Sequence, residues 1–143
     1  MVSARWFSWA SLVLVVVGGA AGVAARAALT LPLSSGGHAL TVPTVTLGIN
    51  VVGSFLLGAV VGWLDDRHPR LRALLGTGVL GGFTTYSAFA VQAVQTATDA
   101  PFVGLALMAV SLFGGVLAAA LGLVVGRRIA GVPDEVEAPE DAE

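Results

Sequence analysis

Four long apolar stretches, separated by short polar segments, constrain this chain more than any other feature. They cover about residues 9–30, 43–64, 73–97 and 102–126. A helix needs about 20 mostly apolar residues to cross the hydrocarbon core of a bilayer. Backbone polar groups cannot stay unpaired in lipid, and the alternation typical of a membrane barrel is absent. The sequence therefore predicts an all-α membrane protein with four transmembrane helices.

The composition excludes an ordinary soluble enzyme. Charged residues make up 11% of the chain, against about 25% in a typical soluble domain. Cysteine is absent, which rules out disulfides, thiolate metal sites and thiol catalysis. We expect residues 1–132 to form the transmembrane domain and residues 133–143, PDEVEAPEDAE, to be a disordered acidic tail. A cleaved signal peptide is an alternative for the first stretch, but three further spans would still anchor the chain.

The arginines are distributed unequally between the two sides of the predicted bundle. Arg26, near the end of the first span, is the only one outside the side that carries both termini and the 65–72 loop. Since positive loops stay in the cytoplasm, both termini are predicted to be cytoplasmic in a multi-pass protein of the cell membrane. The arginines of the termini and the 65–72 loop are Arg5, Arg67, Arg70, Arg72, Arg127 and Arg128.

Small residues recur at helical spacing and indicate close helix packing. Gly18 and Gly22 lie four residues apart, and so do Gly58 and Gly62. Such faces let helix backbones approach each other in lipid. Because four helices alone hardly enclose a polar path, we also expect association with another subunit. A third row of small residues consists of Gly114, Ala118, Gly122 and Gly126.

Polar residues inside the second span allow two interpretations. Asn50, the only asparagine of the chain, shares a helix face with Thr46 and Ser54, each four residues away. The amide can form hydrogen bonds between helices, worth about 0.6 kcal/mol per contact. It can equally serve as a donor that lines a pore, since polar residues in membranes mark pathways.

The third span contains a weak point for a helix. Gly81 and Gly82 lie in mid-membrane, and Thr84, Thr85 and Ser87 follow at once. A broken helix at this depth frees carbonyl groups that bind cations and exposes N–H groups that favour anions. We therefore predict a break in the third helix.

A stripe of two rings and two amides follows this point. Tyr86, Phe89, Gln92 and Gln95 recur every three residues, and an aromatic ring has a positive edge that can face an anion. Arg26 is the only charge within a span; it either faces a cavity or extends to the headgroups.

The absences favour passive conduction of an anion. No acidic residue lies well inside a span, whereas a proton-coupled carrier normally needs an ionisable relay there. A small four-helix drug/proton antiporter would fit the size but should carry a carboxylate in its first span. A non-conducting structural subunit is the remaining alternative. No pattern typical of an enzyme is present.

Three segments resemble the Fluc (CrcB) family of fluoride channels. GGAAGVAARAAL (18–29) is similar to the first-helix pattern, and TLGINVVGSFLLG (46–58) to the signature of the second helix. GVLGGFTTYSAF (78–89) is similar to the third-helix signature, with Tyr86 where phenylalanine is usual. The resemblance covers about residues 10–127.

The resemblance implies an antiparallel, dual-topology dimer that exports fluoride passively and so lowers its toxicity. It implies a structural sodium ion, not transported, on the backbone carbonyls of Gly81 and Thr84. The arginine bias instead suggests a subunit that inserts one way and pairs with a homologous partner of opposite orientation. The pore-lining positions implied by the resemblance are Asn50, Tyr86, Phe89, Thr85, Ser87, Ser111 and Arg26.

Overall fold

A computed structural model describes residues 8–33, 38–65 and 67–131. The predicted acidic tail at 133–143 and Arg5 lie outside these residues. Within the described chain, four helical segments are long and apolar enough to cross a membrane, which confirms the predicted all-α architecture with four membrane-length helices.

Three of the four segments are formed by one long helix each, and the third is composite. The composite segment runs from α3 (Pro69–Arg72) through η2 (Ala73–Leu80), which has π-helical hydrogen bonding, and α4 (Gly81–Phe83) to α5 (Tyr86–Asp99). The other helices are α1 (Trp9–Thr30), continued by the short η1 (Leu31–Leu33), α2 (Thr41–Leu64) and α6 (Pro101–Ala130).

Local sequence explains where α6 begins and ends. Pro101 occupies the first turn, where its missing N–H is not needed and its fixed φ suits a helix. Gly131 ends the helix with a φ of 66°, a left-handed conformation that favours glycine. Arg127 and Arg128 lie in the last turn, where their charges complement the negative end of the helix dipole.

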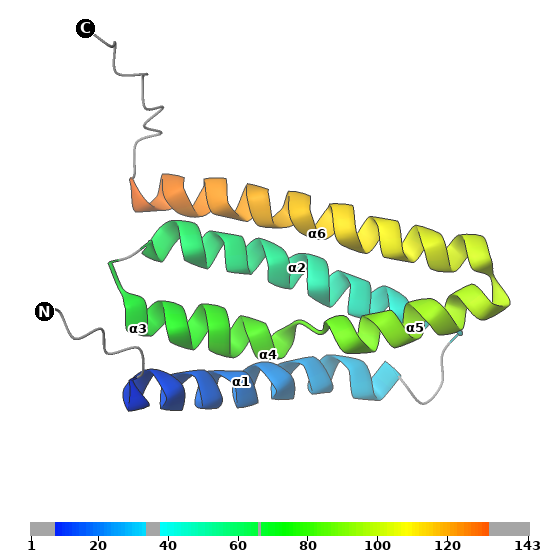
Figure 1. The fold of residues 1–143 in the computed structure, drawn as a ribbon, viewed down its shortest axis with the longest axis horizontal. Helices are drawn as coiled ribbons and strands as arrows, with labels where there is room; N and C mark the ends of the chain where they lie inside the picture. The colour runs from blue at the N-terminus through cyan, green and yellow to red at the C-terminus, as the bar shows by residue number, and fades with distance from the viewer. Residues whose placement is uncertain (1–7, 34–37, 66, 132–143) are drawn as a thin grey trace, which may run out of the picture.

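The four segments lie side by side and alternate in direction (Figure 1). In that view α6 lies next to α2, and the composite segment separates α2 from α1. The start of α1, the α2–α3 connection and the end of α6 share one end of the bundle, and the α5–α6 connection lies at the other end. The described arginines of the predicted cytoplasmic side, from the α2–α3 region and the end of α6, therefore lie together.

Glycines let α2 and α6 approach closely. A methyl group added at Gly58 or Gly62 would overlap the backbone of α6 at Ala119 or Leu123. The reverse holds for Gly122 and Gly126, which face the backbone of α2. The packing role predicted for these stripes is thus confirmed, except at Gly114, where an added Cβ would meet only a Val51 methyl at 3.7 Å.

The same device joins α1 to the composite segment. A side chain at Gly18 would clash with the backbone of η2, and one at Gly22 with the backbone at Val79 and Phe83. Gly82 faces the backbone of Gly19 in the same way. These contacts fix the first part of the composite segment against α1 and so position the residues that follow Phe83.

Candidate functional site

Two residues with extended backbone separate α4 from α5. Thr84 has φ −77° and ψ 155°, and Thr85 has φ −149° and ψ 113° (Figure 1). The weak point predicted from Gly81 and Gly82 is displaced, because both glycines are helical in α4. Gly82 instead serves the close contact with α1, and the two threonines carry the extended conformation.

The side chain of Asn50 pairs with both backbone groups of Thr85. Its Nδ2 donates to the Thr85 carbonyl oxygen at 3.0 Å, and the Thr85 N–H donates to Oδ1 at 2.8 Å. The amide therefore supplies the acceptor that the Thr85 N–H lacks in the helices, and it adds a donor to the Thr85 carbonyl, which as the N-cap carbonyl also accepts the first bond of α5. It thereby ties α2 to the extended pair. The other N–H of Nδ2 has no protein partner among the described residues.

The threonine hydroxyls complete the local hydrogen bonding. Thr84 donates to the Leu80 carbonyl from both its backbone N–H and its Oγ1, each at 3.0 Å. Thr85 Oγ1 accepts from the Ala88 N–H at 3.3 Å and so caps α5. Thr85 Oγ1 also lies 3.4 Å from Ser87 Oγ, at hydrogen-bonding distance on the exposed side.

The carbonyl oxygens of Gly81 and Thr84 are among those that the interruption leaves without their helical partners. In a continuous helix Gly81 would accept from the Thr85 N–H, but that group donates to Asn50. Thr84 would accept from the Ala88 N–H, but that group donates to the Thr85 hydroxyl. Both carbonyls carry partial negative charge that is free for another donor or a cation.

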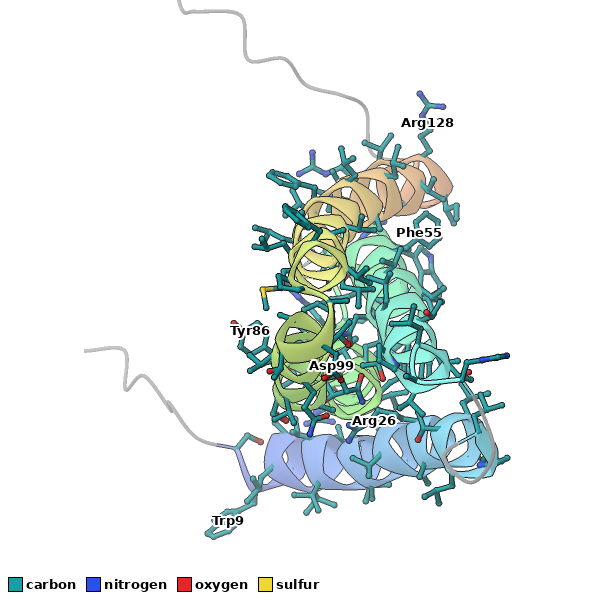
Figure 2. All side chains as sticks on the ribbon, turned by 90° about the vertical axis from the view of Figure 1, so that its right-hand side faces the viewer. Trp9, Arg26, Phe55, Tyr86, Asp99 and Arg128 are labelled. Carbon is teal, nitrogen blue, oxygen red and sulfur yellow. The ribbon has the colours of Figure 1, made fainter. Side chains whose placement is uncertain are left out.

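A cavity of about 590 Å³, which we call the aromatic cavity, lies beside the extended pair. Tyr86 on its wall is 84% exposed and points outward from the side of the bundle (Figure 2), whereas Phe89 is 7% exposed. Five predicted pore residues come together here from α2, the extended pair, α5 and α6. They are Asn50, Thr85, Tyr86, Phe89 and Ser111.

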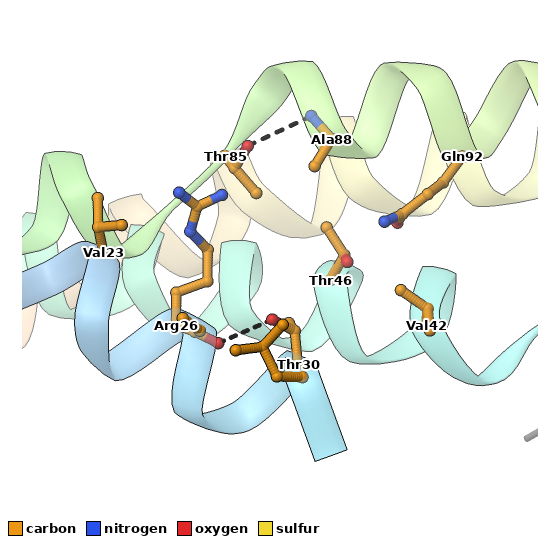
Figure 3. Close-up of a pocket in the computed structure, with 10 residues that line it drawn as sticks. Val23, Arg26, Thr30, Val42, Thr46, Thr85, Ala88 and Gln92 are labelled. Atoms are coloured by element: carbon orange, nitrogen blue, oxygen red, sulfur yellow. Dashed lines mark hydrogen bonds between the residues drawn. The ribbon is translucent and has the colours of Figure 1, made fainter. Parts of the chain in front are cut away.

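A second cavity of about 250 Å³, the arginine cavity, is lined by other residues of α1, α2 and α5. The Arg26 side chain extends from α1 toward the segment at Thr85 (Figure 3). Arg26 does not line the aromatic cavity. Thr85 lines both cavities and so lies between Arg26 and the aromatic cavity. Neither Ser87 nor Gly81 lines either of these two cavities.

Two residues of the arginine cavity belong to the polar patterns seen in the sequence but not to the predicted pore-lining positions. Thr46 is 2% exposed, and its face of α2 was visible from the four-residue spacing to Asn50. Gln92 lines the same cavity, and its Oε1 is buried without a partner in the described chain. The three-residue spacing from Phe89 to Gln92 indicates that the two side chains share a helix face, but the sequence does not reveal that the Gln92 oxygen is buried.

Comparison with known proteins identifies the family. Residues 13–123 match the family model described as "CrcB-like protein, Camphor Resistance (CrcB)". The chain is 40% identical over 120 residues to "Fluoride-specific ion channel FluC 2" of Bacillus subtilis (strain 168), covering 82% of this chain and 88% of that protein.

Two further relatives agree. The chain is 42% identical over 129 residues to "Fluoride-specific ion channel FluC" of Sorangium cellulosum (strain So ce56), covering 87% of this chain and 96% of that protein. It is 43% identical over 122 residues to "Fluoride-specific ion channel FluC 2" of Leifsonia xyli subsp. xyli (strain CTCB07), covering 81% of this chain and 75% of that protein. On the match over most of its length, this four-helix membrane protein belongs to the CrcB family of fluoride-specific ion channels.

Proposed function

We propose that this chain is a subunit of a fluoride-specific channel that lets fluoride leave the cytoplasm down its gradient. The observation that carries the proposal is the aromatic cavity, where polar groups of three helices and two aromatic rings gather beside a helix interruption. The names of the relatives supply the identity of the ion.

Selectivity would come from fixed donors that replace the hydration shell of a small anion in a narrow site. The second N–H of Asn50 and the hydroxyl of Ser111 are available donors. Of the Thr85 and Ser87 hydroxyls, which lie 3.4 Å apart, one can donate to the other, and the other hydroxyl is then available to an ion. The edges of Tyr86 and Phe89 add positive partial charge. Arg26, which has no ion-pair partner among the described residues, raises the local anion concentration in the adjoining cavity.

A structural sodium ion, held by the carbonyl oxygens of Gly81 and Thr84, is part of the proposal. The fit rests on the hydrogen bonding, because both carbonyls lack their helical partners and unwound carbonyls are ligands that sodium uses in membranes. When bound, the ion would supply positive charge that compensates these carbonyls. Two oxygens from one chain are too few to surround a cation, which favours a second subunit at the same place.

An antiparallel dimer is the assembly that we propose. Asn50, Ser54, Thr85 and Ser111 line a cavity at the side of the helix bundle, where lipid would leave polar groups unpaired. A second subunit that covers the cavity would remove this cost and enclose a path. The partner is a second copy or, because the arginines lie at one end, a homologous subunit of opposite orientation.

Fluoride efflux from sodium-loaded liposomes that contain only this protein, measured with a fluoride electrode, tests the proposal. We expect efflux that Phe89→Ile abolishes while dimer elution in size-exclusion chromatography is retained. Chloride efflux as fast as fluoride efflux would contradict the proposed selectivity. Efflux only after co-expression with a homologous subunit would select the heterodimer over the homodimer.

A further inference from the structure

A third cavity, of about 560 Å³, opens at the end of the bundle opposite the arginine-rich end. We call it the end cavity; it lies between the start of α2, at Leu40 and Pro43, and the second half of α5. Val42 and Gln92 line both this cavity and the arginine cavity, so the two adjoin. Their lining residues on the α5 side run from Thr85 to Asp99.

The wall between the two cavities contains a buried acceptor that a water molecule can satisfy. The buried Oε1 of Gln92 has no partner in the described chain, and a buried acceptor without a donor is costly. A water molecule occupies about 30 Å³ of liquid, so each cavity has room for several. A shared water at this oxygen would make the two cavities one hydrated passage.

The passage carries opposite charges at its two parts. Among the described residues, Arg26 is the only charged one that lines the arginine cavity, and Asp99 is the only charged one that lines the end cavity. Gln92, Gln95 and Asp99 are spaced three and four residues apart on α5, so Asp99 closes the same helix face at its outer end. Figure 2, which looks onto this end, shows Asp99 near the middle of the bundle.

A carboxylate at the mouth of such a passage repels anions that approach it. In water, repulsion by one unit charge lowers the local concentration of a monovalent anion about fivefold at 4 Å and about twofold at 8 Å. The effect weakens with salt, because the Debye length falls from about 30 Å at 0.01 M to about 3 Å at 1 M. A cation-lined passage without this group would admit anions faster at low salt.

We propose that the Asp99 carboxylate limits the entry of small anions through the end cavity. The inference rests on the proposed function, since it assumes that fluoride reaches the aromatic cavity past Arg26. It assigns to Asp99 no contact with the ion; the carboxylate acts through its field at the mouth.

The test compares fluoride efflux from liposomes for the wild type, Asp99→Asn, Asp99→Arg and the control Asp65→Asn. Asp65 is an exposed carboxylate at the opposite end of α2, and asparagine keeps the size and shape of its side chain while removing the charge. At about 0.01 M ionic strength, we expect Asp99→Asn to raise the initial rate about two- to fivefold and Asp99→Arg to raise it further. At 1 M salt, set with an impermeant electrolyte, the rates should converge.

The outcomes separate this inference from the proposed function. Equal low-salt rates for the wild type and both Asp99 variants would overturn the role of Asp99 while leaving a fluoride channel. An increase that persists at 1 M salt would also overturn it, because a structural effect does not screen. Absence of efflux from every protein would overturn the proposed function and this inference with it.

Discussion

The amide group of Asn50 has donors and acceptors for two roles. Its Oδ1 accepts from the Thr85 N–H at 2.8 Å and one N–H of Nδ2 donates to the Thr85 carbonyl at 3.0 Å, which leaves the second N–H available beside the aromatic cavity. The two interpretations drawn from the sequence, bonding between helices and donation to an ion, are therefore compatible. The first is present in the structure, and the second stays a prediction.

Asn50→Asp isolates this amide. An aspartate can still accept from the Thr85 N–H, but its carboxylate would face the Thr85 carbonyl oxygen in place of a donor. Replacing this donor by a carboxylate oxygen sets two acceptors against each other, which should cost about 1–3 kcal/mol. We expect a lower midpoint of thermal unfolding in detergent and loss of fluoride efflux.

Thr98→Ala is the matched control, because it removes an exposed hydroxyl that bonds only within α5, to the Val94 carbonyl. Its unfolding midpoint and efflux should remain those of the wild type. Asn50→Asp with an unchanged midpoint and unchanged efflux would contradict the role given to the amide.

At the scale of the helices, the glycine contacts allow a clean comparison within α2. A Cβ at Gly58 would overlap the Ala119 carbonyl of α6, whereas one at Gly48 would meet nothing within 4 Å. Gly58→Ala should push α2 from α6 and lower the unfolding midpoint in detergent, since close packing drives helix association in lipid. Gly48→Ala should leave the midpoint unchanged or raise it, because alanine favours a helix by about 1 kcal/mol. Equal midpoints for the two variants would contradict the packing model.

The sequence predicts the four spans and their close contacts but not the position of the extended pair. Hydropathy gives the four spans, and spacing gives the packing role of Gly58 and Gly122, because both depend on local composition. The position of the extended pair was not predictable, since glycine is permissive and tertiary contact with Gly19 keeps Gly82 helical.

The cavities were predicted in part. The polar face of α2 and the third-helix signature indicated residues that do meet, among them Asn50, Thr85 and Phe89. That Arg26 lies across Thr85 from that cavity depends on the register between α1 and α5, which a single sequence does not contain. The burial of the Gln92 oxygen depends on the same register.

For the whole molecule, the grouping of arginines at one end predicts a fixed orientation. The chain has no cysteine, so Thr98→Cys and Ile129→Cys each introduce a unique reporter thiol, and the two positions lie at opposite ends of the bundle. If the arginine-rich end stays inside, a membrane-impermeant maleimide should label the Thr98→Cys variant in intact spheroplasts and the Ile129→Cys variant only after lysis. Comparable labelling of both variants before lysis would show insertion in both directions and contradict the fixed-orientation alternative. Total labelling after lysis controls for expression.

Thr85 lies between the aromatic cavity and the arginine cavity, and Asn50 is bonded to both its N–H and its carbonyl. A rigid-body displacement of α2 therefore carries Thr85 along. Because Thr85 lines both cavities, a shift that widens one of them also changes the shape of the other. The passage of an ion through the two cavities is therefore coupled at this residue.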